Sequence, residues 1–258
     1  MTKGESVAVV TGGGSGIGEA AARRLAVAGY RLAVLDIDAP HGEKVAASIG
    51  APSVFIKVDV ADEASVAAAA GAVKSTFGRV DVLVNSGGVL QNATRVLDME
   101  LDEAERILKV NYLGTVACCQ VFGRMMKAAG RGSIINLASV NSFRCSAQPA
   151  YGATKTAVVS LTETLAAELG PSGVRVNAVA PGYTLTPAMQ ARIDSGQRDP
   201  KLILGATALG RWVMPADVAE AILFLCSDAA ACITGVTLPI DAGWLVNTSY
   251  RAWAAQPS

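Results

Sequence analysis

A glycine-rich turn near the amino terminus places the strongest constraint on the fold. The apolar run 7–10 leads directly into Thr-Gly-Gly-Gly-Ser-Gly-Ile-Gly at positions 11–18, and a helical pattern covers residues 17–28. A second apolar run, 31–35, follows and is closed by Asp36. We therefore predict a β–α–β unit. In this context the glycines let the backbone approach a pyrophosphate, which the amides and dipole at the helix start then hold.

The alternation of apolar runs and helical patterns continues along the chain. Runs of Val, Ile and Leu with helices between them are typical of a parallel sheet covered on both faces. We predict one α/β domain over residues 1–258, a Rossmann-type doubly wound parallel sheet of about seven strands with helices on both faces. A substrate lid is expected at about 183–212 and a short tail at about 244–258. Further strands are expected at 54–58, 81–84, 133–138, 174–179 and 236–240, and helices at 42–49, 64–77, 149–169 and 216–226, with two long helices flanking Asn111.

Polar residues gather where the predicted strands end. Asp36 and Asp59 follow two strands, Asn85 and Ser139 close two others, and Pro181 breaks another. Parallel strands end at the same edge of a sheet, and such sheets bind ligands beyond that edge. We therefore expect the residues that carry the chemistry to lie along one rim.

Tyr151 and Lys155 lie four positions apart within the predicted helix 149–169. This spacing puts the phenol and the ammonium on one helix face. A free tyrosine has a pKa of about 10, and a nearby cation favours the phenolate. We therefore predict that Lys155 lowers the pKa of Tyr151, and that Ser139 adds a hydroxyl, so that the three side chains hold and deprotonate an alcohol. Taken alone, the spacing is equally compatible with an ordinary amphipathic helix.

Composition argues against several kinds of partner. The 22 Lys and Arg residues balance 22 Asp and Glu residues without a basic run, so we expect no nucleic-acid partner. No apolar stretch approaches bilayer length, so we expect no membrane association. Five cysteines without a Cys-x-x-Cys favour reduced thiols in the cytoplasm. The single histidine, His41, stands in a predicted loop at the start of a helix, so we expect no metal site.

Seven sequence elements occur together in a fixed order. They are Thr11-Gly-x-x-x-Gly16-x-Gly18, Asp59-Val60, Asn85 with the glycines after it, Asn111, Ser139, Tyr151-x-x-x-Lys155, and Pro181-Gly182 with Thr186. With these elements the chain resembles the short-chain dehydrogenase/reductase family from residue 7 to about residue 243. The resemblance implies a seven-stranded parallel sheet, usually in a homotetramer.

The resemblance also implies roles for single residues. Tyr151 would be the general acid/base, and Lys155 would lower its pKa and bind the nicotinamide ribose. Ser139 would hydrogen-bond the substrate oxygen, and Asn111 would support a water that relays the proton, although an asparagine there can also cap or bend a helix. The coenzyme would lie against Gly12, Ser15, Gly16, Ile17, Gly18, Asp36, Ile37, Asp59, Val60, Asn85, Ser86, Gly87, Tyr151, Lys155, Pro181, Gly182, Thr184 and Thr186.

Two departures from the family pattern stand out. The chain has Asn85-Ser86-Gly87-Gly88 where the family usually has Asn-Asn-Ala-Gly. The smaller side chains keep the close approach of backbone to coenzyme. Ser139 stands twelve positions before Tyr151, one fewer than the commonest spacing in the family. The loop between them lines the substrate pocket in relatives, so the shortened loop changes the expected shape of that pocket.

Asp36 predicts the coenzyme. It lies eighteen positions beyond Gly18, where an acid in this fold meets the adenosine ribose. A carboxylate accepts hydrogen bonds from both ribose hydroxyls of NAD but repels a 2′-phosphate. The neighbouring positions that would compensate, Ser15 and Ile37, are uncharged. Asp36 could instead cap the next helix, but Pro40 and His41 intervene before the predicted start of that helix. We expect NAD.

The expected function is an NAD-dependent oxidoreductase that interconverts a secondary alcohol and its ketone. Two alternatives stay open, an NADPH-dependent 3-oxoacyl reductase and a nucleotide-binding sensor of the same fold without turnover. Beside Ser139 and Tyr151, Arg144 and Gln148 are candidate substrate residues, since Arg144 could receive a carboxylate or phosphate bidentately. A solvated loop arginine, or one paired across a subunit interface, is the favoured interpretation of Arg144.

Helix 149–169 also bears on assembly. Its apolar residues form two adjacent stripes, and a single sheet face covers only one of them. The second stripe favours a homotetramer, unless another helix of the same chain covers it. The stripes are Val158, Leu161 and Leu165, and Val159, Ala166 and Leu169.

Overall fold

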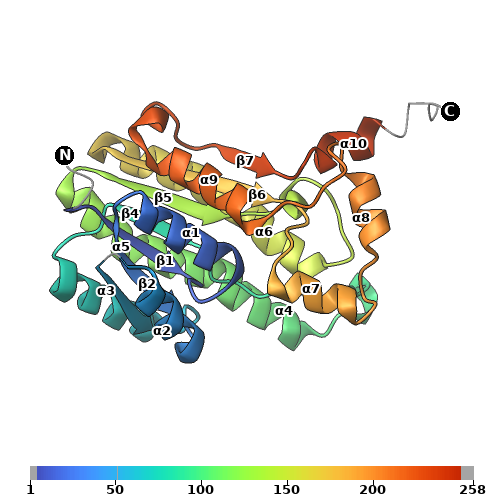
Figure 1. Ribbon diagram of the computed structural model, residues 1–258, viewed down its shortest axis with the longest axis horizontal. Helices are drawn as coiled ribbons and strands as arrows, with labels where there is room; N and C mark the ends of the chain where they lie inside the picture. The colour runs from blue at the N-terminus through green and yellow to red at the C-terminus, as the bar shows by residue number, and fades with distance from the viewer. Residues whose placement is uncertain (1–4, 51, 251–258) are drawn as a thin grey trace.

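The computed structural model describes residues 5–50 and 52–250 and contains one sheet of seven parallel strands (Figure 1). The strand order is β3-β2-β1-β4-β5-β6-β7. The predicted α/β class and doubly wound sheet are therefore confirmed. The strands are β1 (Val7–Thr11), β2 (Arg31–Asp36), β3 (Ser53–Lys57), β4 (Val82–Asn85), β5 (Gly132–Leu137), β6 (Val174–Pro181) and β7 (Thr237–Ile240).

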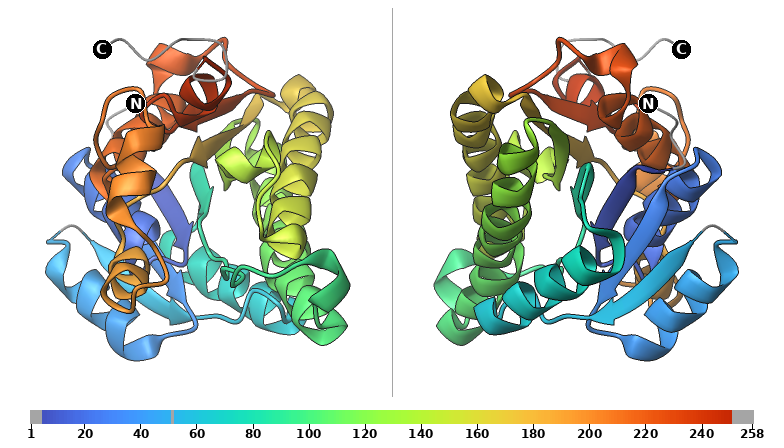
Figure 2. Two further views of the ribbon diagram at one scale, coloured as in Figure 1. Left: turned by 90° about the vertical axis from the view of Figure 1, so that its right-hand side faces the viewer. Right: turned by 90° about the vertical axis from the view of Figure 1, so that its left-hand side faces the viewer.

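Helices cover both faces of the sheet (Figure 2). One face packs against α1 (Gly16–Val27), α2 (Ala39–Ser48) and α9 (Pro215–Cys226). The other packs against α3 (Glu63–Phe77), α5 (Gly114–Ala129) and α6 (Pro149–Leu169). Alternate residues of a strand point to opposite faces, and in β1 Val10 belongs to the first core while Val9 belongs to the second. Double coverage thus explains why the strands read as unbroken apolar runs.

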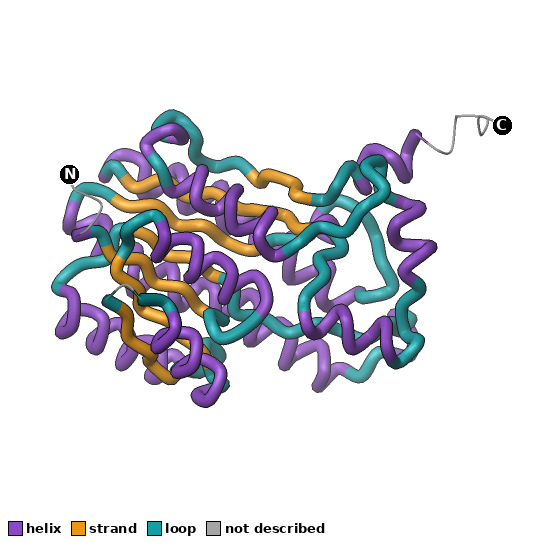
Figure 3. The backbone as a smooth tube through the Cα atoms, in the orientation of Figure 1, coloured by secondary structure: helices purple, strands orange, loops and turns teal. Residues whose placement is uncertain are grey.

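The carboxyl ends of all seven strands point to one end of the molecule, where the remaining helices gather (Figure 3). α7 (Pro187–Asp194) and α8 (Pro200–Ala206) lie in the predicted lid, and α10 (Trp244–Tyr250) packs beside α8. The predicted tail therefore begins as a helix, and its residues 251–258 lie outside the described residues. β1 lies between β2 and β4, so the strand order reverses beside β1, where folds of this kind open a crevice.

The start of α2 differs from the prediction. Asp38 caps the helix by accepting a hydrogen bond from the backbone N–H of His41 at 3.3 Å. Pro40 falls in the first turn, where its missing N–H costs nothing. The helix therefore begins at Ala39, three residues earlier than predicted, and placing His41 in a loop was wrong. Because Asp38 caps the helix, the carboxylate of Asp36 is not its cap.

The two helices predicted to flank Asn111 are present as α4 (Leu101–Leu108) and α5. A π-helical turn at Lys109–Leu113, which was not predicted, joins them into one continuous helical segment. Such turns insert an extra residue into the helix and re-aim the side chains around it. Asn111 lies inside this turn and is fully buried.

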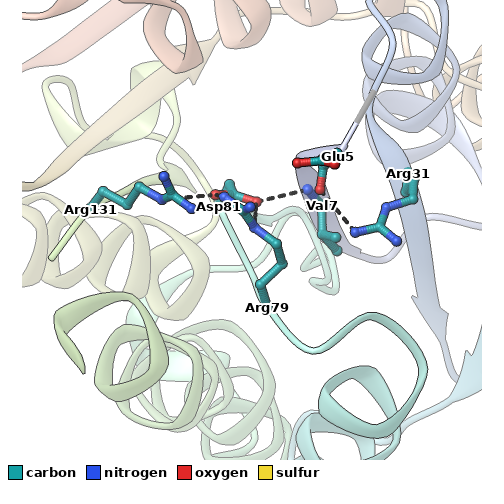
Figure 4. A network of polar contacts seen from close by, with 6 residues as sticks. All are labelled: Glu5, Val7, Arg31, Arg79, Asp81 and Arg131. Atoms are coloured by element: carbon teal, nitrogen blue, oxygen red, sulfur yellow. Dashed lines mark hydrogen bonds and ion pairs between the residues drawn. The ribbon is translucent and has the colours of Figure 1, made fainter. Parts of the chain in front are cut away.

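At the amino ends of the strands, the carboxylate of Asp81 connects the start of β1 with the segments that precede β4 and β5 (Figure 4). Asp81, just before β4, accepts a hydrogen bond from the Val7 N–H at 2.9 Å. The same carboxylate binds the Arg79 guanidinium and forms an ion pair with Arg131 at 3.5 Å. A carboxylate shared by two guanidiniums and a backbone amide is far more stabilising than a lone surface pair, so this cluster fixes the starts of β1 and β4.

Two further findings concern partners and metals. Among the described residues, no helix combines the length and apolar character needed to cross a bilayer. Within the same ranges, no three His, Cys, Asp or Glu side chains come together in a way that could hold a metal ion.

Candidate active site

A cleft of about 650 Å³ opens at the carboxyl ends of the strands. Loops that follow β1 to β6 supply its walls, together with the first turns of α6 and α7. The cleft brings most of the predicted site residues together. These are Gly12, Ser15, Gly16, Ile17, Asp36, Ile37, Asp59, Val60, Ser86, Gly87, Ser139, Tyr151, Lys155, Pro181, Gly182, Thr184 and Thr186.

The glycine-rich turn is packed too closely to admit larger side chains. Gly12 has a φ of 62°, and a Cβ there would lie 2.7 Å from the Cα of Gly87. Thr11 joins the same two loops, because its Oγ1 accepts a hydrogen bond from the Gly87 N–H at 3.1 Å. A Cβ on Gly18 would lie 2.0 Å from the carbonyl oxygen of Gly12. Gly18 therefore packs α1 onto the turn and does not line the cleft.

The start of α1 fits a pyrophosphate. Ser15 is its N-cap residue and, within the described residues, makes no side-chain capping hydrogen bond. The first amides of a helix have no acceptor inside the helix, and the helix dipole adds positive potential there. Gly16 lies beside them with a φ of 55°, a conformation that glycine adopts freely. These amides and Ser15 face the cleft and suit a bound phosphate.

Asp36 presents a carboxylate to the cleft. Its Oδ2 accepts a hydrogen bond from the Gly14 N–H at 2.8 Å, and its Oδ1 accepts one from the Asp38 N–H at 3.0 Å. A carboxylate has about four lone-pair sites, so these two bonds fix its orientation and leave acceptor capacity for a ligand. The neighbouring Ile37 is exposed and uncharged. Among the described residues, Arg106 and Lys155 are the cations that line the cleft, and Lys57, the Cα partner of Asp36 on β3, does not line it.

Ser139, Tyr151 and Lys155 meet on the other side of the cleft. Ser139 caps a short 3-10 turn (Val140–Ser142), its Oγ accepting from the Asn141 N–H at 3.2 Å. The Ser139 hydroxyl lies close enough to the Tyr151 phenol to lower its pKa. The Lys155 ammonium lies 5.7 Å from the centroid of the Tyr151 ring and donates to the Leu137 carbonyl at 2.7 Å. α6 thus carries a phenol and an ammonium on the face that turns to the end of β5.

In the protein alone, burial has the largest influence on the pKa of Tyr151, and the predicted lowering of that pKa by Lys155 stays a prediction. Burial raises the pKa of Tyr151 above its ordinary value, and the Ser139 hydroxyl and the charge of Arg192 only oppose that rise. Burial also lowers the pKa of Lys155 from 10.5 to about 8. Both changes have one cause, because withdrawal from water, nearly complete for Lys155 and partial for Tyr151, disfavours the charged form of either group.

Two predicted asparagines lie behind the cleft. Asn85 is buried, and its Nδ2 donates to Asn136 Oδ1 at 2.9 Å, so the side chain joins β4 to β5 inside the sheet. Asn111 forms two hydrogen bonds with one residue, accepting from the Val89 N–H at 2.8 Å and donating to the Val89 carbonyl at 2.9 Å. Asn85 thus joins two strands at their carboxyl ends, and Asn111 fixes the loop that contains Val89, a residue that lines the cleft.

Two predicted substrate residues lie elsewhere. Arg144 is exposed and donates to the Phe143 carbonyl at 2.9 Å. Gln148 binds the Gln91 carbonyl through its Nε2 and accepts from Asn141 Nδ2 at 3.2 Å. Both line a separate shallow depression between the Ser139–Tyr151 loop and α6. The structure therefore does not bring Arg144 or Gln148 to Ser139 and Tyr151.

Sequence reasoning missed three residues near the site. Arg106 of α4 lines the cleft, Gln91 is fully buried behind it, and Arg192 of α7 reaches back to Gln91 and Asn92. Each is brought in by a contact between segments far apart in the chain. Local sequence carries no signal for such contacts beyond the expectation that a lid follows β6.

Comparison with known proteins agrees with this geometry. A family model described as enoyl-(acyl carrier protein) reductase matches residues 12–245. A D-threitol dehydrogenase of Mycolicibacterium smegmatis is 41% identical over 244 residues, which cover 93% of each chain.

The chain belongs to the short-chain dehydrogenase/reductase family.

Solved structures of similar proteins support this assignment. The structure of a 3-ketoacyl-(acyl-carrier-protein) reductase from Brucella melitensis, complexed with NADH, superposes with a TM-score of 0.87 at 36% identity, covering 93% of this chain and 98% of that one. A protein of Brucella melitensis 16M named ribose-5-phosphate isomerase superposes with a TM-score of 0.94 at 42% identity, covering 98% and 97%. Members of one short-chain dehydrogenase/reductase fold thus carry different names, so the substrate has to be argued from the site.

Proposed function

We propose that the protein is an NAD-dependent oxidoreductase that interconverts a secondary alcohol and its ketone. One observation carries the proposal: Ser139, Tyr151 and Lys155 line the same cleft as Asp36. A coenzyme that reaches from Asp36 to Lys155 would bring its nicotinamide beside a proton donor. The relative crystallised with NADH supports a nicotinamide coenzyme.

The residues present fit such a coenzyme. The glycine-rich turn and the first amides of α1 would hold its pyrophosphate, Asp36 its adenosine ribose, and Lys155 its nicotinamide ribose. When bound, the coenzyme supplies or accepts the hydride, and the protein provides orientation and proton handling.

Tyr151 would move the proton. Because burial raises its pKa, Tyr151 is protonated at neutral pH and can donate to the oxygen of a ketone as that oxygen gains charge. Ser139 would hold the same oxygen through its hydroxyl. In the direction of alcohol oxidation Tyr151 must first lose its proton, so the rate of oxidation should rise as the pH rises toward the raised pKa of Tyr151. The rate of reduction should fall only as the pH approaches that pKa.

Other functions fit the site less well. The name of one relative suggests an aldose–ketose isomerase. Such an enzyme would not need a carboxylate such as Asp36 placed in the cleft to bind the ribose of a coenzyme. An NADPH-dependent 3-oxoacyl reductase would need a cation beside Asp36, where Ile37 is uncharged. A sensor without turnover would not need Ser139, Tyr151 and Lys155 to meet in one cleft. We propose polyols as the most suitable class of substrate, because the D-threitol dehydrogenase is 41% identical to this chain over 244 residues.

We further propose a homotetramer located in the cytoplasm. On α6, Val158, Ala166 and Leu169 are buried within the chain, whereas Val159, Leu161 and Leu165 are only half-buried. α4 packs beside α6, and Leu97 and Leu101 nearby are 96% and 76% exposed. The five cysteines are free, which favours a reducing compartment, and cell fractionation would test that location.

For assembly, we expect light scattering at micromolar protein to give four times the chain mass of 26.4 kDa. The half-buried α6 residues and the exposed leucines beside them would be covered by neighbouring subunits. A mass of one chain at that concentration would contradict the proposal.

For catalysis, Tyr151→Phe should keep the fold and bind NADH but lose about 10²–10⁴-fold in kcat, because the variant has no proton to transfer. The assay follows NADH absorbance with a panel of polyols, cyclic alcohols, hydroxy acids and hydroxysteroids, and their ketones. Tyr250→Phe is the matched control, because Tyr250 is exposed on α10. If Tyr151→Phe kept more than half of the original rate, the proton-transfer role would be wrong.

For the coenzyme, kcat/KM with NAD should exceed that with NADP about a hundredfold or more, which corresponds to roughly 2–4 kcal/mol. The double substitution Asp36→Ala and Ile37→Arg should narrow or reverse the preference, because it removes the repulsion and supplies a phosphate partner. Asp38→Ala is the control, because the Asp38 side chain caps α2 and binds His41, while the backbone N–H that binds Asp36 is kept in the variant. Equal values of kcat/KM with NAD and NADP in the unaltered protein would contradict the proposal that Asp36 selects NAD.

A further inference from the structure

Gln91 is fully buried in the loop between β4 and α4, and its side chain binds the start of α6. Its Oε1 accepts hydrogen bonds from the backbone N–H groups of Ala150 at 3.0 Å and Tyr151 at 3.1 Å. These two bonds fix the orientation of the amide group. Its Nε2 is left without a hydrogen-bond partner among the described residues.

Gln91 caps the amino end of α6, although it lies far from that helix in the sequence. The first amides of a helix have no acceptor inside it and are usually satisfied by the side chain of the preceding N-cap residue. In α6 that residue is Gln148, whose side chain makes no such bond within the described residues. The acceptor comes instead from Gln91, 60 positions before Tyr151. The backbone of Tyr151 is therefore held directly by a buried side chain of another segment.

The backbone carbonyl of Gln91 also binds α7, a helix of the predicted lid. The carbonyl of Gln91 accepts hydrogen bonds from Gln148 Nε2 and, at 3.5 Å, from Arg192 Nη1 of α7. A second bond from Arg192 Nη2 to Asn92 Oδ1 at 3.2 Å strengthens this attachment. Gln91 thus contacts both the turn that carries Tyr151 and the lid helix.

We propose that Gln91 is a positioning residue, which fixes the backbone of Tyr151 at the cleft and ties α7 to the same point without touching the substrate. The proposal rests on the proposed role of Tyr151 in proton transfer. The charge of Arg192 lowers the pKa of Tyr151, so the attachment of α7 also keeps a cation near the phenol.

The expected effect is kinetic. Proton transfer requires the phenol within hydrogen-bond reach of the substrate oxygen, and a displacement of about 1 Å can cost on the order of 10²-fold in rate. The coenzyme would bind at Asp36, the α1 turn and Lys155, none of which Gln91 contacts through a hydrogen bond in the described structure. Loss of the Gln91 acceptor should therefore lower kcat and leave coenzyme affinity unchanged.

Two substitutions separate the acceptor from the rest of the side chain. Gln91→Met and Gln91→Glu both remove the unpartnered Nε2, but only glutamate, whether ionised or protonated at this buried position, keeps an oxygen that can accept from the two amides. We expect Gln91→Met to lose about 10- to 100-fold in kcat with an unchanged Kd for NADH. Gln91→Glu should recover kcat to within about threefold of the unaltered enzyme, a rescue that follows from the acceptor it keeps. Gln120→Met, on the exposed side of α5, is the matched control.

The outcomes distinguish this proposal from the proposed function. If Tyr151→Phe is inactive but Gln91→Met keeps kcat within twofold, only the role of Gln91 is wrong. If Gln91→Glu is as slow as Gln91→Met at equal folded, NADH-binding concentration, Gln91 serves the fold and not the position of Tyr151. If Tyr151→Phe stays active, the proposed function itself fails.

If Gln91→Met does not fold, hydrogen exchange of the backbone amides in the unaltered protein tests the role of Gln91 instead. In the unaltered holoenzyme, the amides of Ala150 and Tyr151 should exchange at least 100-fold more slowly than in an unstructured peptide, because a buried acceptor holds them. Exchange at the unprotected rate would overturn the role of Gln91.

Discussion

Parallel pairing is the constraint on which the site depends. Every strand of the sheet ends at the same rim, so residues that follow different strands meet although they lie far apart in sequence. Asp36 is the last residue of β2 and Ser139 follows β5, with β1 and β4 between these two strands. The reversal of strand order beside β1 opens the space between them. At the opposite ends of the strands, the ion-pair cluster around Asp81 fixes where β1 and β4 begin.

Burial sets the ionisation of Lys155 and Tyr151. A fall in the Lys155 pKa from 10.5 to about 8 corresponds to roughly 3 kcal/mol against the charged ammonium. The single carbonyl of Leu137 that the ammonium binds offsets only part of this cost. The same burial raises the pKa of Tyr151. A bound coenzyme that accepts hydrogen bonds from Lys155 would stabilise its charged form, and the ammonium would then favour the phenolate.

Patterns local in the chain predicted most of the fold. The bounds of α6 were predicted correctly, because Pro149 suits a first turn and Gly170 follows the last apolar residue. The glycine turn and Asp36 were predicted to share one rim, and the structure brings both to the cleft. The start of α2 was missed because Pro40 was taken as a break, although Asp38 caps the helix and admits proline in its first turn. The π-helical turn around Asn111 has no simple sequence signal.

Side-chain partners across the fold could not be predicted in the same way. Arg144 is close to Ser139 in sequence, yet the turn after Ser139 directs it to a separate depression. Gln91 and Arg192 belong to segments about a hundred positions apart, and their contact depends on how α7 folds back over the cleft. Periodicity and strand ends give the position of a residue on an element, whereas these contacts depend on the path of the loops between elements.

A crystal structure of the protein with NADH would test the central claim most directly. The claim is that one coenzyme spans the cleft from Asp36 to the catalytic turn. The expected result is that both adenosine ribose hydroxyls donate to the Asp36 carboxylate while the nicotinamide lies beside Tyr151 and Lys155. A coenzyme whose ribose lies away from Asp36, or whose nicotinamide lies outside the reach of Tyr151, would contradict it.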